Sequence, residues 1–259
     1  MINAATRAVV VGGSQGLGLA IAHQLVAEGC EAIVISGRDA ARGEAAARQL
    51  AQAGGHVEFI GADIAAVEDC ARLVEEAARR IGPLNGLVNA AAACDRGGLL
   101  DTTPAIWARL MDTNARGPFF TMQAFVRQAR ALGQPASIVN IVSMVIHCGQ
   151  SYLAPYSASK AALANLTRNT AQALRGDRIR CNAIACGWMD TPGEDATQRK
   201  YHAAPDDWLA RAEAKQPFGR LVKPADVAPL ATYLLSPRSG VMTGAIIDCD
   251  QNVAGAYPE

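Results

Sequence analysis

Short apolar runs recur along the chain, and segments of helical periodicity separate them. Seven runs are predicted to be strands, at residues 8–11, 32–36, 57–61, 86–89, 137–142, 180–185 and 245–248. The early runs are continuously apolar, which is typical of parallel strands buried on both faces of a sheet. Segments 40–53 and 67–81 have helical periodicity. This alternation predicts an α/β fold: a Rossmann-type doubly wound parallel sheet of about seven strands with helices on both faces.

No linker or internal repeat divides the 259 residues, and one α/β domain of this length is ordinary. We therefore expect a single domain over residues 1–259. The stretch between Gly187 and Pro217 lacks strand character, is charged, and contains Pro192 and Pro205. Long excursions of this kind are often functional, so residues 188–216 are predicted to form a lid over the substrate. A pair of short surface helices would fit the same pattern.

The charge balance argues against several classes of partner. Lys and Arg together number 24, as do Asp and Glu, and the basic residues are scattered, whereas nucleic-acid binders usually carry a basic excess or stripe. No apolar run approaches the roughly 18 residues of a membrane helix, and the N-terminus lacks the features of a signal peptide. We expect a cytoplasmic protein that binds neither nucleic acid nor membrane.

The seven cysteines are odd in number and show no C-x-x-C spacing. Because their neighbours are mostly apolar, we expect buried free thiols in a reducing compartment. The four histidines also lack the spacing of zinc ligands. No metal site is therefore expected.

A glycine-rich turn follows the first predicted strand and opens a helical stretch, with the sequence Gly12-Gly13-Ser14-Gln15-Gly16-Leu17-Gly18. Glycines permit a tight turn and let backbone N–H groups approach a phosphate, while the helix N-terminus favours negative charge. The turn therefore predicts a dinucleotide site formed by Gly12, Ser14, Gln15, Gly16, Leu17 and Gly18.

The end of the second predicted strand bears on the choice of cofactor. Arg38 lies twenty residues after Gly18, where an acidic residue binds the ribose hydroxyls of NAD and an arginine accommodates the 2′-phosphate of NADP. Gly37 occupies the place of the acid. NADP(H) is therefore favoured, with NAD(H) as the alternative. Asp39 could also bind the ribose, although it is well placed to cap the following helix.

Tyr156 and Lys160 carry the strongest chemical signal. They are four residues apart on a helix that Pro155 can begin, so they share one face. A tyrosine has a pKa near 10, and a neighbouring ammonium lowers it. Ser143 closes an apolar strand thirteen residues before Tyr156, at the kind of strand end where α/β sheets bind ligands. An exposed helix pair is the alternative, which the order and context of these residues disfavour.

These motifs are spread over nearly the entire chain and resemble the short, single-domain branch of the short-chain dehydrogenase/reductase family. The resemblance implies a Ser-Tyr-Lys-Asn catalytic set in which Asn114 helps to hold a water linked to Lys160. It also implies a homotetramer. Asp63 would bind the adenine, unless it caps a helix. The cofactor residues implied beyond the glycine turn and Arg38 are Asp63, Ile64, Asn89, Tyr156, Lys160, Gly187, Met189 and Thr191.

The chain departs from the family pattern near the cofactor. Val11 stands where the family has Thr, Ala90 and Ala92 replace an Asn and a Gly after Asn89, and Cys186 stands in the place of a Pro. These changes indicate a repacked strand junction. They weaken the sheet-stabilising role implied for Asn89 without affecting the cofactor site.

The implied reaction interconverts a secondary alcohol and a ketone by hydride transfer at a nicotinamide. Tyr156 would move the proton, Lys160 would bind the nicotinamide ribose and lower the tyrosine pKa, and Ser143 would orient the substrate oxygen. Ser143, His147 and Trp188 are the candidate substrate residues, and Asp95 and Gln150 are expected beside the pocket.

The resemblance implies that the substrate is a small alcohol or carbonyl compound. Polar residues around the pocket favour a sugar or polyol. A general ketone or 3-oxoacyl reductase is the alternative, and a non-catalytic cofactor-binding regulator is the rival from another class. An epimerase or dehydratase usually needs an added substrate domain, for which the chain is too short.

Overall fold

Seven parallel strands form one sheet in the computed structural model, which describes residues 1–255. The order is β3-β2-β1-β4-β5-β6-β7. Successive strands are therefore added on one side of β1 up to β3 and on its other side from β4 onward. The predicted strands are confirmed to within one residue at each end. Their bounds are β1 Arg7–Val11, β2 Ala32–Gly37, β3 Val57–Gly61, β4 Gly86–Asn89, β5 Ala136–Ser143, β6 Ile179–Cys186 and β7 Ile246–Cys249.

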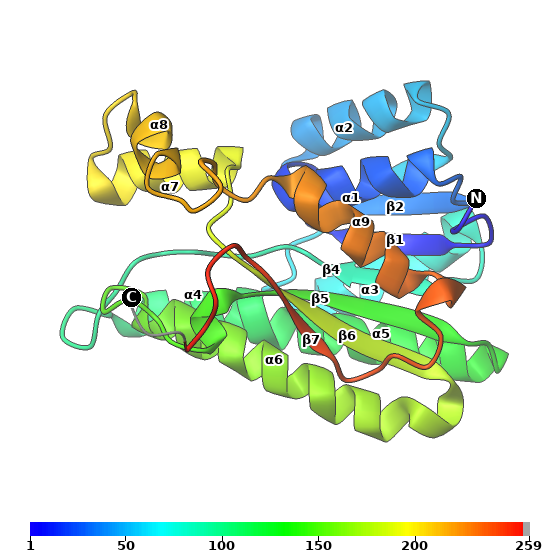
Figure 1. Ribbon diagram of the computed structural model, residues 1–259. Helices are drawn as coiled ribbons and strands as arrows, with labels where there is room; N and C mark the ends of the chain where they lie inside the picture. Colours follow the sequence, from blue (N-terminus) through cyan, green and yellow to red (C-terminus); the bar gives the residue numbers. More distant parts are fainter. Residues whose placement is uncertain (256–259) are drawn as a thin grey trace.

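Helices cover both faces of the sheet, as Figure 1 shows. One face carries α1 (Gly16–Ala27), α2 (Ala40–Gln52) and α9 (Pro224–Leu235), and the other carries α3 (Val67–Ile81), α5 (Gly117–Leu132) and α6 (Ala154–Leu174). Helix α4 (Pro104–Met111) runs through a π-helical turn, Asp112–Arg116, into α5. The structure thus confirms the doubly wound Rossmann-type fold.

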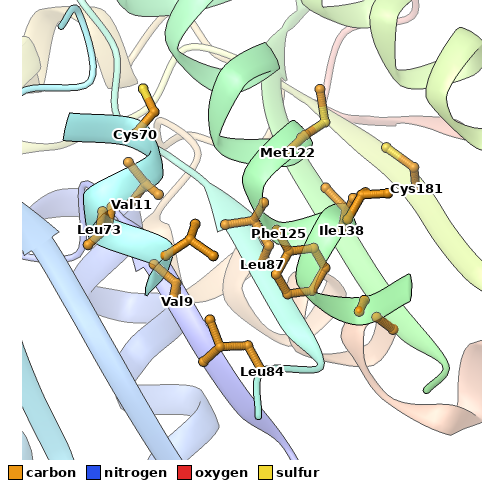
Figure 2. Packing of buried hydrophobic residues seen from close by; sticks show 14 of the residues in the cluster. Val9, Val11, Cys70, Leu73, Leu84, Leu87, Met122, Phe125, Ile138 and Cys181 are labelled. Atoms are coloured by element: carbon orange, nitrogen blue, oxygen red, sulfur yellow. The ribbon is translucent and has the colours of Figure 1, made fainter. Parts of the chain in front are cut away.

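The sheet divides the hydrophobic core into two clusters, one on each face. Val9 and Val11 of β1 point to one side and pack with Leu87 and Phe125 (Figure 2). Ala8 and Val10 point to the other side, into a cluster with residues of α1 and α9. Because successive side chains of a strand alternate between faces, a strand covered on both sides must be apolar throughout, as the sequence predicted.

The segment 188–216 contains two short helices, α7 (Pro192–His202) and α8 (Trp208–Glu213). They lie together at the end of the molecule to which the carboxyl ends of the strands point (Figure 1). Thr191 caps α7 by accepting a hydrogen bond from the Glu194 amide. Trp208 packs with Leu221 in a small core of its own. The segment is therefore the helix pair that the sequence allowed.

All seven cysteines are free thiols, and Cys30, Cys70, Cys181 and Cys186 are buried. The expectation of burial is wrong for Cys148, which is exposed on the loop after β5. Cys94 and Cys249 are half-buried. In residues 1–255 no three His, Cys, Asp or Glu side chains gather as metal ligands. The helices described here include none that is long and apolar enough to cross a membrane.

Candidate active site

A cleft of about 1140 Å³ opens at the carboxyl ends of the strands, above the neighbouring strands β1 and β4 where the strand order reverses. The fold explains this position, because helices leave β1 and β4 toward opposite faces and open a crevice between them. Two predicted site residues, Asn89 and Asn114, lie outside its lining. The others line it: Gly12, Ser14, Gln15, Gly16, Leu17, Gly18, Arg38, Asp63, Ile64, Ser143, His147, Tyr156, Lys160, Gly187, Trp188, Met189 and Thr191.

The glycine turn forms the floor of this cleft between β1 and α1. At Gly12, which has φ +80°, a Cβ would lie 2.6 Å from the Ala91 amide nitrogen, and at Gly18 it would lie 2.2 Å from the Gly12 carbonyl oxygen. Only glycine therefore lets this turn approach the neighbouring backbone so closely. The N-terminus of α1 faces the cleft and can receive a pyrophosphate.

The ribose end of the cleft has no carboxylate at the end of β2. A Cβ on Gly37 would lie 2.9 Å from the Ser14 hydroxyl, so a side chain there requires only that this hydroxyl rotates away. Asp39, the competing acid, caps α2 by accepting from the Arg42 amide at 3.0 Å and pairs with the Arg42 guanidinium at 2.9 Å. Arg38 is exposed and lines the cleft.

Arg42 is a cleft residue that the sequence reasoning missed. Its Nη1 donates to Gln15 Oε1 at 2.5 Å and thereby joins α2 to the glycine turn. The sequence could have indicated Arg42, because it lies three residues after the cap Asp39, and residues at this spacing lie on the same face of a helix.

At the adenine end, Asp63 does not cap α3, whose N-cap is Ala66. Its Oδ1 accepts from the Ala65 amide at 3.1 Å, and its own amide donates to Asp69 Oδ2 at 2.8 Å. These bonds hold the turn after β3 with Asp63 and Ile64 facing the cleft.

Asn89 lies within the sheet beneath the cleft. Its Nδ2 donates to Asn140 Oδ1 at 2.8 Å and ties β4 to β5, while its Oδ1 has no hydrogen-bond partner among residues 1–255. The buried amide pair does join two strands despite the altered residues that follow Asn89. Direct contact of Asn89 with a cofactor stays a prediction.

The fold brings Ser143, Tyr156 and Lys160 together in the cleft. Ser143 is the last residue of β5, and Tyr156 and Lys160 occupy the first turns of α6. Lys160 is buried, its Nζ lies 6.0 Å from the centre of the Tyr156 ring, and it donates to the Ile141 carbonyl oxygen at 2.8 Å. The structure thus places a proton donor, a cation and a hydroxyl at one point.

Burial raises the pKa of Tyr156 far above its usual value of 10, and a hydrogen bond with Ser143 acts in the opposite direction. Burial also lowers the pKa of Lys160, to about 8. The lowered tyrosine pKa that the sequence predicted is therefore not found, and a lowering by Lys160 stays a prediction. Desolvation opposes both charges, and the ammonium is directed to a carbonyl oxygen.

Asn114 is buried in the π-helical turn between α4 and α5. Its Oδ1 accepts from the Ala93 amide at 2.8 Å, and its Nδ2 donates to the Ala93 carbonyl at 2.8 Å and to Ser159 Oγ at 3.0 Å. The side chain therefore fixes the loop after β4 against α6. Its place in a proton relay stays a prediction. Because the side-chain amide is engaged in these bonds, we expect any relay through Asn114 to use its main-chain atoms.

The predicted nicotinamide segment begins at Gly187, where a Cβ would lie 2.1 Å from Asp250 Oδ1. Met189 pairs with Val222 in an isolated bridge, so the start of segment 188–216 is fixed to the loop before α9. Trp188 stacks on Trp208 with ring centres 6.3 Å apart and donates to Glu194 Oε1 at 2.8 Å.

His147 lines the cleft, and its Nε2 lies 2.9 Å from Asp248 Oδ1, so β7 holds one edge of the ring. Gln150 also lines the cleft, as expected. Asp95 does not, because it turns away to accept from the Tyr201 hydroxyl at 2.7 Å and to pair with Arg109 at 3.2 Å.

Other polar residues of the cleft were not among the predicted site residues: Cys94, Arg96, Glu194, Gln198 and His202. The last three are spaced at i, i+4 and i+8, which places them on one face of α7. This spacing was the available signal. Arg96 and Cys94 lie on the irregular loop after β4, and no periodicity could have pointed to them.

Comparisons with known proteins agree with this geometry. The family described as Enoyl-(Acyl carrier protein) reductase matches residues 11–252. Cis-4-hydroxycyclohexanecarboxylate dehydrogenase of Sinomonas cyclohexanicum is 34% identical over 94% of each chain. NADP-dependent (R)-specific alcohol dehydrogenase of Lentilactobacillus kefiri is 31% identical over 92% of each chain.

A solved structure titled short chain dehydrogenase/reductase family protein is 33% identical, with a TM-score of 0.83, and the match covers 97% of this chain and 98% of that one. A crystal structure of a variant actinorhodin polyketide ketoreductase with NADPH has a TM-score of 0.91, at 27% identity and with the same coverage. On this evidence the chain belongs to the short-chain dehydrogenase/reductase family and is an NAD(P)-dependent oxidoreductase.

Proposed function

We propose that this protein uses NADP(H) to interconvert a secondary alcohol and a ketone, and that the substrate is a polar, hydroxylated molecule such as a sugar or polyol. One observation carries the proposal: Ser143, Tyr156 and Lys160 line the same cleft as the glycine turn. A regulator without turnover has no need for a tyrosine, lysine and serine beside a dinucleotide site.

The cleft fits a dinucleotide on its own geometry. The close approach at Gly12 and Gly18 leaves a backbone cradle at the start of α1 for the pyrophosphate. Arg38 and Arg42 both line the ribose end, and Gly37 presents no acid there. This arrangement supports a 2′-phosphate, and the NADP-dependent relative and the NADPH-bound ketoreductase fit the same choice.

When bound, the nicotinamide gives or takes a hydride at C4. The protein orients the reactants and moves the proton. Ser143 Oγ donates a hydrogen bond to the substrate oxygen, and the Tyr156 hydroxyl gives a proton to that oxygen or takes one from it. The raised pKa keeps Tyr156 protonated and ready to donate in the empty enzyme. Lys160 supplies a positive charge as soon as it is protonated, which favours the phenolate during alcohol oxidation.

The substrate end of the cleft supports a hydroxylated compound. Glu194 and Gln198 offer acceptors and donors from α7, and Trp188, which is 42% exposed, offers an aromatic face. By its name, the relative from Sinomonas cyclohexanicum acts on a polar ring alcohol. A general ketone or 3-oxoacyl reductase is the second candidate, to which the ketoreductase neighbour lends support.

One screen tests these alternatives. Sugars and polyols with NADP⁺, and ketones with NADPH, are followed by the absorbance of the reduced nicotinamide, with the Tyr156→Phe variant as the background. Turnover of hydroxylated compounds over plain ketones supports the proposal. A preference for apolar ketones favours the second candidate, and cofactor binding without turnover of any compound favours the regulator.

The homotetramer also stays a proposal. In a doubly wound sheet the long helices α5 and α6 present outer faces that a second copy can cover, and Phe119 on α5 is 38% exposed. Analytical ultracentrifugation tests the state. A monomer at micromolar concentration would contradict it.

A further inference from the structure

Arg96 is a cation that the reaction described above does not use. It lies on the loop between β4 and α4, lines the same cleft as Tyr156, and its side chain is only 15% exposed. Its Nη1 donates to the Cys94 carbonyl oxygen at 3.0 Å and its Nε to His202 Nε2 at 3.1 Å. The Tyr152 ring lies 5.8 Å from its guanidinium carbon. None of these partners is a carboxylate.

The charge of Arg96 is poorly compensated by the protein. The nearest carboxylate oxygen, Glu194 Oε1, is 3.9 Å from Nη2, beyond hydrogen-bond distance. That oxygen already accepts from Trp188 Nε1 at 2.8 Å and from Gln198 Nε2 at 2.7 Å. Within residues 1–255, Nη2 has no hydrogen-bond acceptor.

Two arginines near this part of the cleft are paired more closely than Arg96. Arg109, on the neighbouring helix, reaches Asp95 at 3.2 Å, and Arg199, on the outer side of α7, reaches Asp195 at 2.9 Å. Taking a guanidinium largely out of water without a hydrogen-bonded anion is costly. Residues that carry such a cost are found where a ligand supplies the missing partner.

We propose that Arg96 binds a carboxylate of the substrate, so that the enzyme acts on hydroxy acids and oxo acids. This inference rests on the proposed function. A guanidinium binds a carboxylate through two parallel N–H donors, and Nη2 has donors to offer inside the cleft. Glu194 selects within the class of anions, because its repulsion at this distance grows with ligand charge. A singly charged carboxylate is therefore favoured over a doubly charged phosphate.

Arg96 also bridges the loop after β4 to α7 through His202, and a purely structural role must be separated from recognition. If Arg96 only bridges these two segments, its loss should reduce kcat/KM for every substrate alike. If it binds a carboxylate, its loss should reduce kcat/KM for acids and leave kcat/KM unchanged for uncharged molecules of the same shape. The ratio of acid to amide activity therefore reports recognition alone.

The experiment uses oxo acids whose carboxylate lies two to four bonds from the ketone, each paired with its primary amide, and NADPH. For the wild type we expect kcat/KM to favour the acid by at least roughly tenfold in the best pair, the range of a charge-assisted hydrogen bond. Arg96→Gln should reduce the ratio to near one, and Arg96→Lys should restore part of it. Arg199→Gln, which removes an exposed arginine of α7, is the control and should keep the wild-type ratio.

Equal losses for acid and amide in Arg96→Gln would assign the residue a structural role and overturn the proposal. A second measurement separates this failure from failure of the proposed function. Calorimetric titration of the wild type and NADP⁺ with the same acids and amides needs no turnover. If the wild type binds the acid more tightly than the amide, and Arg96→Gln loses this difference, the carboxylate site is supported even if no ketone is reduced. The absence of any acid preference in wild-type binding overturns it even in an active enzyme.

Discussion

Lys160 Nζ donates a hydrogen bond of 2.8 Å to the carbonyl oxygen of Ile141, two residues before Ser143. The buried lysine is thus anchored to the strand that carries the serine, and the first turns of α6 are fixed against β5. This bond satisfies one of the three donors of the ammonium, and burial destabilises the remaining charge.

We expect stability to depend on pH through Lys160. Its pKa of about 8 in the folded enzyme is below its ordinary value of 10.5. Between these values the unfolded chain binds more protons than the folded one, so the free energy of unfolding rises with pH in this window. The gain is on the order of 3 kcal/mol from below pH 8 to above pH 10.5.

The measurement is denaturant unfolding of the cofactor-free wild type and Lys160→Met at pH 7 and pH 10.5. The stability of the wild type relative to the variant should improve at the higher pH. Lys215→Met, which removes an exposed lysine, is the control and should run parallel to the wild type. A difference between wild type and Lys160→Met that does not change with pH would contradict the assignment.

Tyr156→Phe should lose turnover by roughly 10²- to 10⁴-fold, the usual contribution of general acid–base catalysis. Cofactor affinity should be retained, because the ring and its neighbours remain. Steady-state rates and fluorescence titration with NADPH check the two parts. Tyr233→Phe, which removes a hydroxyl on α9 outside the lining of the cleft, should stay near wild type. Near-wild-type turnover in Tyr156→Phe would falsify its role.

The cofactor preference should depend on the end of β2. Arg38→Ala is expected to reduce kcat/KM with NADPH by roughly tenfold or more, the worth of a charge-assisted hydrogen bond, and to leave NADH nearly unchanged. Gly37→Asp should reverse the preference, because its carboxylate repels a 2′-phosphate and accepts from ribose hydroxyls. If the wild type prefers NADH and Arg38→Ala changes neither value, the NADP proposal is wrong.

The segment 188–216 is expected to be mobile in the empty enzyme and ordered on binding, as lids are. In the structure it reaches across the cleft, where Cys94 Sγ contacts Thr197 Oγ1 at 3.2 Å. Lys223 holds its base through Asp190 at 2.8 Å and Glu213 at 2.6 Å. Lys223→Met should therefore speed amide hydrogen exchange in this segment, with Lys215→Met as the control.

Exchange is compared with and without cofactor and substrate. Protection should increase on binding in both the wild type and Lys223→Met. Amides of 188–216 that are already fully protected in the empty wild type, and unchanged on binding, would show that the segment is a fixed wall.

The sequence by itself determined the layout of this protein. The apolar runs that became β1 and β4 needed no tertiary information, because a strand covered on both faces must be apolar along its length. The glycine turn was equally readable, since no other residue permits the close approach at Gly12 and Gly18. The spacing of Tyr156 and Lys160 depends only on local helix geometry, and the structure places both residues on α6 as the sequence predicted.

Only the tertiary structure decided how the cleft is lined and charged. Arg96 and Glu194 are almost a hundred residues apart, and nothing local relates them, yet they lie 3.9 Å apart. Asp95 and Arg96 are neighbours in the chain, but one turns toward Tyr201 and the other toward the cleft. The pKa of Tyr156 rises because desolvation outweighs its hydrogen bond with Ser143. Burial and long-range contacts are properties of the packed chain, so no local pattern can report them.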